Sequence, residues 1–398
     1  MFEYKFNMAE TLAIAVCLLL IGRWIKSKVY FFEKFFIPAP VIGGVIFSLF
    51  SLIGYNSKLF MFSFDGSLKD LLMVAFFTTI GFLASFKMLK KGGVQVFTFL
   101  LVAVILVIIQ NGVGVSLAKA FNLNPLIGIA AGSVPLTGGH GTSGAFGPVL
   151  EAAGATGAMS VAIASATFGL VAGCLIGGPV GKRLMLKNGL KGPKENDILS
   201  DGSKDLSEEK VSLNEELLFK AIVFIVLAMG IGGFITPLSK NLGIVLPVYI
   251  GPMLVAAVIR NLADSTKNEI PLNAINVVGN ISLQLFLAMA LMSMRLWELA
   301  ALAVPLVAIL LAQKLVMALY AYFITFRFMG KDYDAAVLAV GHCGFGMGAT
   351  PNAMANMESF TAANGPSPTA FFALPLVGSL FIDFVNASVI TVFINMFS

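Results

Sequence analysis

Two glycine-rich stretches hold the residues whose types and spacing could bind a charged solute. Residues 132–147 read GSVPLTGGHGTSGAFG, and residues 341–352 read GHCGFGMGATPN. Each contains a Gly-His pair, and together they hold the only two histidines, His140 and His342. Glycine lets a ligand come close to the backbone, and free N–H groups at a helix N-terminus bind carboxylates. The stretches therefore predict an anion site, with carbonyl and hydroxyl oxygens available for a cation.

The candidate substrate-binding residues all come from these two stretches. They are Thr137, Gly138, Gly139, His140, Gly141, Thr142, Ser143, His342, Gly344, Gly346, Gly348, Thr350 and Asn352. An alternative is that the glycines only permit close helix packing, but a matching Gly-His core in both stretches is more than packing requires. The histidines are expected to form neutral hydrogen bonds near the substrate or to serve a structural role, because neither stretch supplies the further Cys, Asp or Glu ligands of a metal site.

A second group of candidates consists of polar side chains inside apolar segments. Burying such a group in a membrane is costly, above all when it is ionisable, so each is a candidate for a functional site. Asp383 and Asn386 are three residues apart and share a helix face, as do Asn280 and Gln284 at a spacing of four. Their hard oxygen atoms suit sodium, although interhelical hydrogen bonds are the alternative. We expect sodium binding by these four residues, no other metal, no organic cofactor and no catalytic residue.

The composition indicates a membrane protein. Hydrophobic residues make up 58% of the 398 residues and charged residues 12%, and the mean hydropathy is +0.91. The three cysteines lie far apart in apolar runs, which predicts neither a disulfide framework nor a CxxC metal pair. The net charge of +5 comes from loops between apolar segments, so no nucleic-acid partner is expected.

The elements that must position these residues are ten predicted membrane spans. They lie at about 8–22, 37–55, 67–85, 95–119, 158–180, 218–237, 245–260, 272–294, 300–326 and 369–396. The predicted fold class is an all-α polytopic membrane protein of two five-span halves, residues 1–181 and 218–398, joined by a polar linker at 182–217. Because each half has an odd number of spans, the repeats must be inverted in the membrane.

The glycine-rich stretches are predicted to form one re-entrant hairpin in each half, at about 125–150 and about 334–357. Thr78 and Thr79 lie in the region of the third span that corresponds, in the repeat, to the region of Asn280 in the eighth span. These two spans are therefore expected to cross. Most basic residues fall in loops on one side, which predicts a cytoplasmic linker and two periplasmic termini. The basic cluster after the first apolar segment, without a cleavage site, argues against a secretory signal.

Several longer motifs resemble the bacterial sodium/glutamate symporter family. They are TGGHGT at 137–142, GHCGFGMGATP at 341–351, FIDFVN at 381–386, LFLAMAL at 285–291 and KDYDAA at 331–336. The resemblance covers nearly the whole chain apart from the linker. It implies a homodimer in the lipid of the inner membrane, which imports glutamate with sodium by an elevator-like movement of a transport region against a scaffold.

Three other functions fit parts of the pattern. The same plan would serve a sodium-coupled carrier of citrate or malate. The GTSG sequence at 141–144 matches the short motif of intramembrane serine proteases, with a Ser143–His342 pair as the catalytic group. Protease chemistry gives no reason for duplicated inverted halves, and a channel suits an occluded midplane site less well than a carrier does.

Overall fold

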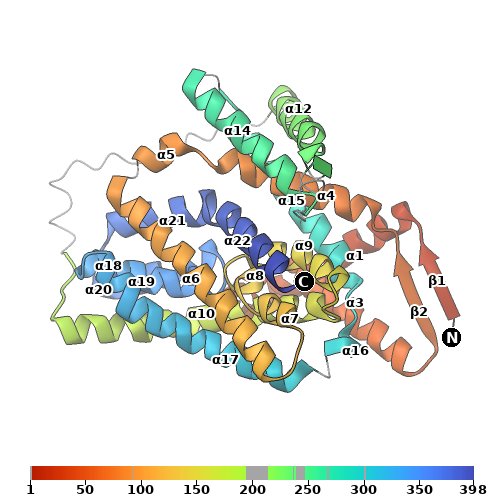
Figure 1. Cartoon of the computed structure of the whole chain (residues 1–398), viewed down its shortest axis with the longest axis horizontal. Coiled ribbons are helices and arrows are strands. Elements are labelled where there is room, and N and C mark those ends of the chain that lie inside the picture. The colour runs from red at the N-terminus through yellow and green to blue at the C-terminus, as the bar shows by residue number, and fades with distance from the viewer. Residues whose placement is uncertain are drawn as a thin grey trace.

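The computed structural model describes residues 2–91, 93–193, 214–235, 237–238, 247–266, 269–299 and 302–398, and this part of the chain is mostly helical (Figure 1). In the first half the elements are β1 Phe2–Phe6, α1 Met8–Lys28, α2 Tyr30–Lys34, α3 Ala39–Asn56, β2 Phe60–Phe64, α4 Ser67–Leu83, α5 Phe86–Lys91, α6 Gly93–Ala120, α7 Pro125–Ala130, α8 Ser133–Leu136, α9 Gly139–Ala152 and α10 Ala158–Asn188. In the second half they are α12 Glu215–Gly232, α14 Ile250–Thr266, α15 Leu272–Met292, α16 Leu296–Leu299, α17 Ala303–Tyr320, the π-helix η2 Ala321–Thr325, α18 Phe326–Phe328, α19 Tyr333–Phe345, α20 Thr350–Asn364, α21 Pro368–Leu380 and α22 Ile382–Phe397.

Six helical segments in the described part of the chain are long and apolar enough to cross a membrane. They are α1, α3, α6, α10, α15 and the continuous stretch Ala303–Phe328, and the bent pair α21 and α22 would make a seventh. The chain is therefore a multi-pass membrane protein. The predicted spans at 67–85 and 245–260 correspond to α4 and α14, which have 17 residues each. Such a helix is about 26 Å long, slightly less than a bilayer core, and the count of ten spans stays a prediction.

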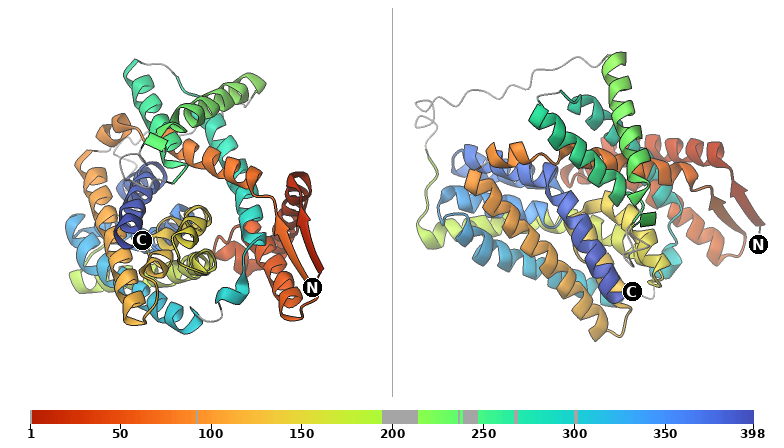
Figure 2. Two further views of the ribbon diagram at one scale, coloured as in Figure 1. Left: turned by 45° about the vertical axis from the view of Figure 1, so that its right-hand side comes forward. Right: turned by 45° about the horizontal axis from the view of Figure 1, so that its top comes forward.

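The helices form two groups that lie side by side (Figure 2). We call α6–α10 and α17–α22 the hairpin bundle, and α1, α3, α4, α12, α14 and α15 the flanking bundle. The hairpin bundle supplies most of the largest hydrophobic core, whereas two smaller cores lie within the flanking bundle. Helix α15 contributes to all three cores, through Ala274, Phe286 and Ala288 among others, and α4 also packs in all three. These two helices therefore join the bundles.

Packing in the flanking bundle has the same pattern in both halves. Helix α1 packs on α3 and α15, as α12 packs on α14 and α4, and α4 crosses α15. Small residues allow the close approach, since a Cβ on Gly81 would lie 2.2 Å from the Met253 carbonyl oxygen and one on Gly279 would lie 2.4 Å from Thr79 Oγ1. The expected crossing of the helices that carry Thr79 and Asn280 is therefore confirmed.

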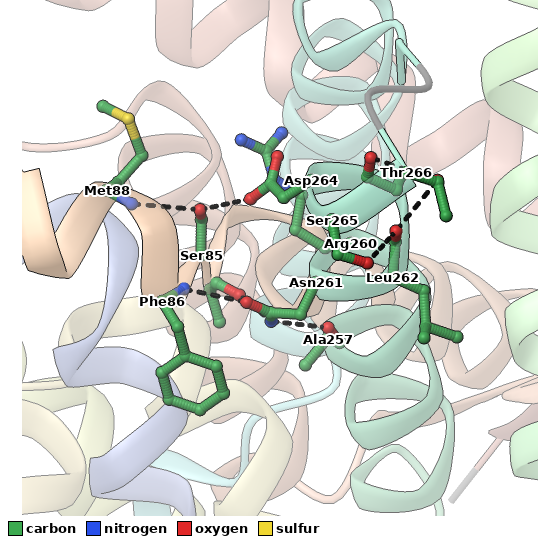
Figure 3. A network of polar contacts seen from close by, with 12 residues as sticks. Ser85, Phe86, Met88, Ala257, Arg260, Asn261, Leu262, Asp264, Ser265 and Thr266 are labelled. Carbon is green, nitrogen blue, oxygen red and sulfur yellow. Dashed lines mark hydrogen bonds and ion pairs between the residues drawn. The ribbon is translucent and has the colours of Figure 1, made fainter.

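Polar contacts fix the turn between α4 and α5 to α14 (Figure 3). The Asn261 side chain accepts a hydrogen bond from Phe86 N at 2.8 Å and donates one to the Ala84 carbonyl oxygen at 2.8 Å. Ser85 Oγ donates to Asp264, which also pairs with Arg260 on the same helix. At the corresponding turn after α15, Trp297 stacks on Tyr55 of α3 with ring centroids 4.1 Å apart. The C-terminal ends of α4 and α15 are thus each held by contacts with a helix from the other half of the chain.

Two features of the fold were not predicted from the sequence. Strands β1 and β2 pair in parallel, with Phe2 opposite Phe60, whereas the sequence predicted an all-α fold without strands. Helix α10 continues past Gly181 to Asn188, and α12 already begins at Glu215. Residues 194–213 of the predicted linker lie outside the described residues.

Candidate functional site

The first glycine-rich stretch forms a helical hairpin from α7, α8 and α9. Its first arm is interrupted between Ala130 and Ser133, and its tip lies at Thr137 and Gly138. Gly139 begins the second arm with φ +66°, a left-handed conformation that favours glycine. At the open end, Asn124 Nδ2 donates to the Gly154 carbonyl oxygen at 3.2 Å. We call this element hairpin 1.

The second glycine-rich stretch forms hairpin 2 from α19 and α20. Its first arm is one uninterrupted helix of 13 residues, and its tip runs from Gly346 to Ala349. The open end is closed by a hydrogen bond from Tyr333 OH to the Gly365 carbonyl oxygen. The predicted hairpin limits, 125–150 and 334–357, agree with these elements except that α20 extends to Asn364.

The two hairpins enter the molecule from opposite ends and meet tip to tip. The base of hairpin 1 contacts the start of α10, where Met159 N donates to Glu151 Oε1, and the base of hairpin 2 lies beside the residues that follow α10. Helix α10 has 31 residues, so the bases are about 45 Å apart. At the tips, a Cβ on Gly139 would lie 3.3 Å from the Gly348 carbonyl oxygen.

Side chains from α6 and α17 hold the tips together. Gln110 Nε2 donates to the Gly346 carbonyl oxygen at 2.6 Å, and Gln110 Oε1 accepts from Thr137 Oγ1 at 2.8 Å. Gln313 Nε2 then donates to the Gln110 carbonyl oxygen at 2.7 Å. Sequence reasoning missed Gln313, although it stands in the ninth predicted span where Gln110 stands in the fourth, at the offset of about 200 residues that relates the two halves.

A cavity of about 380 Å³ lies where the tips meet α4, α15 and α22. This volume is in the usual range of about 300–1,000 Å³ for small-molecule sites. Nine predicted site residues line it, namely Thr137, Gly138, Gly139, His140, Gly141, Gly348, Thr350, Asn280 and Asp383. Its other polar side chains, which were not predicted as site residues, are Thr79, Asn276 and Ser379. The structure thus brings together most of the candidates at the two tips with Asn280 and Asp383.

The electrostatic character of the cavity comes from helix ends and a single carboxylate. Helices α9, α20 and α22 begin at the cavity, and within the described chain no side chain caps their N-termini. Free N–H groups and the positive end of the helix dipole attract carboxylates. Neither Lys nor Arg is among the described residues that line the cavity, and Asp383 is their only carboxylate. The cavity therefore suits an anion that enters together with a cation.

The two histidines occupy different environments. His140 lines the cavity, and its Nε2 lies 3.0 Å from Thr167 Oγ1. His342 is fully buried away from the cavity, with Nδ1 2.8 Å from Thr325 Oγ1 and its ring packed by Phe99 and other aromatic residues. A role near the substrate fits His140, and a structural role fits His342.

Other predicted substrate contacts lie inside the hairpins rather than on the cavity surface. Thr142, Ser143, Gly344, Gly346 and Asn352 do not belong to the described cavity lining. Ser143 Oγ donates to the Gly139 carbonyl oxygen at 2.7 Å, and Asn352 Nδ2 donates to the Leu170 carbonyl oxygen at 2.9 Å. Ser143 therefore bonds within hairpin 1 and Asn352 fixes hairpin 2 to α10, and the contact of all five residues with substrate stays a prediction.

The four predicted sodium ligands do not form one cluster. Asp383 and Asn280 line the cavity. Asn386 is buried elsewhere, where its Nδ2 donates to the Ser133 carbonyl oxygen at 3.1 Å. Gln284 Oε1 accepts from Arg23 Nη2 at 2.6 Å near the surface. Residues three or four apart can thus meet different partners, because the neighbouring helices decide what each side chain contacts.

The fold and the site together define a class of protein, a multi-pass helical membrane protein with a solute-sized cavity between two helical hairpins. A family model described as sodium/glutamate symporter matches residues 4–366. The chain is 44% identical over 400 aligned residues to the sodium/glutamate symporter of Escherichia coli (strain K12), covering 99% of this chain and 98% of that protein. It is 40% identical over 394 residues to the sodium/glutamate symporter of Haemophilus influenzae, covering 98% of each. The chain therefore belongs to the sodium/glutamate symporter family, which comprises transporters rather than enzymes.

Proposed function

We propose that this chain is a secondary transporter that brings L-glutamate into the bacterial cell together with sodium ions. The observation that carries the proposal is the cavity at the meeting point of the two hairpin tips, where uncapped helix N-termini and one carboxylate converge. The relatives at 40–44% identity are named for the same pair of solutes. Family and site geometry therefore support one function.

Glutamate is held by the hairpin tips. One carboxylate accepts hydrogen bonds from the N–H groups at the start of α9, and the other accepts from those at the start of α20. His140 and Thr350 line the same cavity and supply side-chain hydrogen bonds. Helix N-termini bind the carboxylates in place of the arginine found in many soluble carboxylate sites, because the described cavity wall contains neither Lys nor Arg.

Asp383 and Asn280 are the proposed cation ligands of the cavity. Asp383 adds a negative charge to a site for a substrate whose net charge is negative, and a cation bound beside it offsets the repulsion. Sodium supplies this charge, which makes glutamate binding depend on the ion. The amide oxygen of Asn280 contributes a second hard ligand from the other bundle.

Movement of the hairpin bundle against α4 and α15 completes the proposed transport cycle. The cavity lies on the boundary, with the tips on one side and Thr79, Asn276 and Asn280 on the other. A shift of the hairpin bundle along this boundary would carry the solute across the membrane in an elevator-like step. The proposal includes ten spans in two inverted repeats, re-entrant hairpins, a homodimer in the inner membrane, periplasmic termini and a cytoplasmic linker.

Reconstitution tests this function. Purified protein in proteoliposomes should accumulate labelled L-glutamate under an inward sodium gradient, and uptake should cease when an inward potassium gradient replaces it. Labelled citrate and malate serve as competing solutes in parallel. Sodium-driven uptake of citrate or malate without glutamate uptake would move the chain to a 2-hydroxycarboxylate carrier.

A further inference from the structure

A buried polar cluster surrounds the break between α7 and α8, outside the described lining of the cavity. Its members are Ser133 at the break, Asn111 from α6, Gln313 from α17 and Asn386 from α22, and none of these residues is more than 1% exposed. Two halves of the chain thus contribute polar side chains to one interrupted helix. Such an arrangement needs a physical reason, because buried polar atoms without partners are destabilising.

Hydrogen bonds fix the direction of the two amides that come from the second half. Asn386 Nδ2 donates to the Ser133 carbonyl oxygen at 3.1 Å. Gln313 Nε2 donates to the Gln110 carbonyl oxygen at 2.7 Å and lies 3.5 Å from the Ala131 carbonyl oxygen. Both nitrogens are therefore committed to backbone acceptors, and neither amide can be turned over without losing these bonds.

Three of the cluster's side-chain oxygens have no partner among the described residues. Within the described chain, Gln313 Oε1, Asn386 Oδ1 and Ser133 Oγ are buried atoms that make no hydrogen bond. A buried acceptor that nothing binds is destabilising. Asn111 belongs to the same group, since its Oδ1 accepts a hydrogen bond from Ser133 N at 2.9 Å. Among the described residues, its Nδ2 and the Ser133 hydroxyl are donors of the cluster without a partner.

We propose that this cluster binds a sodium ion, at a second cation site separate from Asp383 and Asn280. Three neutral oxygens suit a monovalent ion, whereas a divalent ion would call for carboxylates, which the cluster lacks among its described members. Oxygens beside unwound backbone in a broken helix are the usual ligands of coupling ions in transporters. The assignment rests on the proposed sodium-coupled function, and it adds Ser133 and Gln313 to the ion-binding residues.

An ion at this position would connect hairpin 1 to the rest of the hairpin bundle. It would join the first arm of hairpin 1 to α17 and α22, next to the bond between Thr137 Oγ1 and Gln110 Oε1 that shapes the tip. Binding of sodium here orders the tip before glutamate arrives. Sodium should therefore stabilise the protein in the absence of glutamate and raise its affinity for glutamate.

Ser133→Ala tests the second site, because it removes an oxygen that makes no protein hydrogen bond. Ser165→Ala is the matched control, since Ser165 is equally buried and its Oγ donates to Val161 within its own helix. The full-length protein is titrated with sodium chloride against choline chloride without glutamate, and the unfolding temperature is recorded. Half-saturating sodium should rise about tenfold in Ser133→Ala, equivalent to about 1.4 kcal/mol, and stay unchanged in Ser165→Ala.

A second variant, Asp383→Asn, distinguishes the cation site in the cavity from the site in the buried cluster. Asp383→Asn should keep the sodium-dependent stabilisation seen without glutamate while it weakens sodium activation of uptake. An unchanged sodium titration in Ser133→Ala would overturn the site, whatever the unfolding temperature of this variant in choline. A native protein that sodium does not stabilise in the absence of glutamate would also overturn the site, whereas glutamate uptake that does not depend on sodium would refute the proposed function.

Discussion

Hairpin 1 and hairpin 2 share a Gly-His pair but use it differently. In hairpin 1 the tip comes directly before Gly139 and His140, so the histidine lies in the first turn of the second arm and reaches the cavity. In hairpin 2 the tip follows His342, which therefore lies in the last turn of the first arm and is buried. Equal motifs in duplicated halves thus do not imply equal roles, because the position of the tip decides which side chain meets the solute.

The largest expected effect concerns His342. Replacing His342 with Ala should destabilise the protein by about 2–5 kcal/mol, the range for large-to-small changes in a packed core, because the ring fills a space among Phe99, Tyr320 and Phe345. His140→Ala should lower the unfolding temperature far less and should raise the KM for glutamate about tenfold, as expected for the loss of a hydrogen bond to a charged ligand. Thermal unfolding and uptake kinetics of both variants would measure this difference. Equal unfolding temperatures of the two variants would contradict the different roles of the two histidines.

The second-largest effect is expected for Gly169→Ala, which tests how closely the tip of hairpin 2 packs on α10. A Cβ on Gly169 would lie 2.1 Å from the Met347 carbonyl oxygen, whereas nothing lies within 4 Å of one on Gly178 in the same helix. Gly169→Ala should cost about 1–3 kcal/mol of stability, as overpacking usually does, and should reduce the maximal uptake rate. Gly178→Ala is the control, and a Gly169→Ala variant as stable and as active as this control would contradict the described packing.

A smaller effect is expected for Asp383, which belongs to a helix that packs on hairpin 1 through α7 and α8. Asp383→Asn keeps the size of the side chain and removes its charge. Half-maximal activation of uptake should then need about tenfold more sodium, equivalent to about 1.4 kcal/mol. Unchanged sodium activation, with altered preference between glutamate and 2-hydroxyglutarate, would show that the carboxylate binds the substrate ammonium group instead.

The smallest effect is predicted for Ser143, the residue that an intramembrane protease would need as its nucleophile. Its Oγ donates to the Gly139 carbonyl oxygen within hairpin 1, while His342 Nδ1 lies beside Thr325 Oγ1 in the core. Ser143→Ala should change stability by only about 1 kcal/mol, the net value of a hydrogen bond, and most glutamate uptake should remain. Peptide cleavage that disappears in this variant would favour the enzyme.

The sequence was sufficient to predict both hairpins because glycine and proline interrupt apolar segments at matching places in the two halves. Helices α7 to α9 and α19 to α20 lie within a few residues of the predicted ranges except at the end of α20. The crossing of α4 and α15 also followed from the repeat, since polar residues mark the same point in both helices.

What the sequence could not provide was the surroundings of each polar side chain. Asn386 and Asp383 share a helix face by spacing, yet Ser133 meets Asn386 while the cavity receives Asp383. Gln284 was expected to bind sodium, but it accepts a hydrogen bond from Arg23 of α1, which is far from α15 in sequence and packs on it in the fold. These outcomes depend on which helices are neighbours in the fold, and periodicity along a single helix contains no such information.

Protection of a cysteine at Thr350 tests most directly whether glutamate lies between the tips. Cys17→Ser and Cys174→Ser would remove the exposed and half-buried native thiols, and the buried Cys343 would remain. In this background a maleimide should label Thr350→Cys quickly in choline, and glutamate with sodium should slow the labelling at least about tenfold. An unchanged labelling rate, in a variant that still takes up glutamate, would place the substrate outside the cavity formed by the two hairpins.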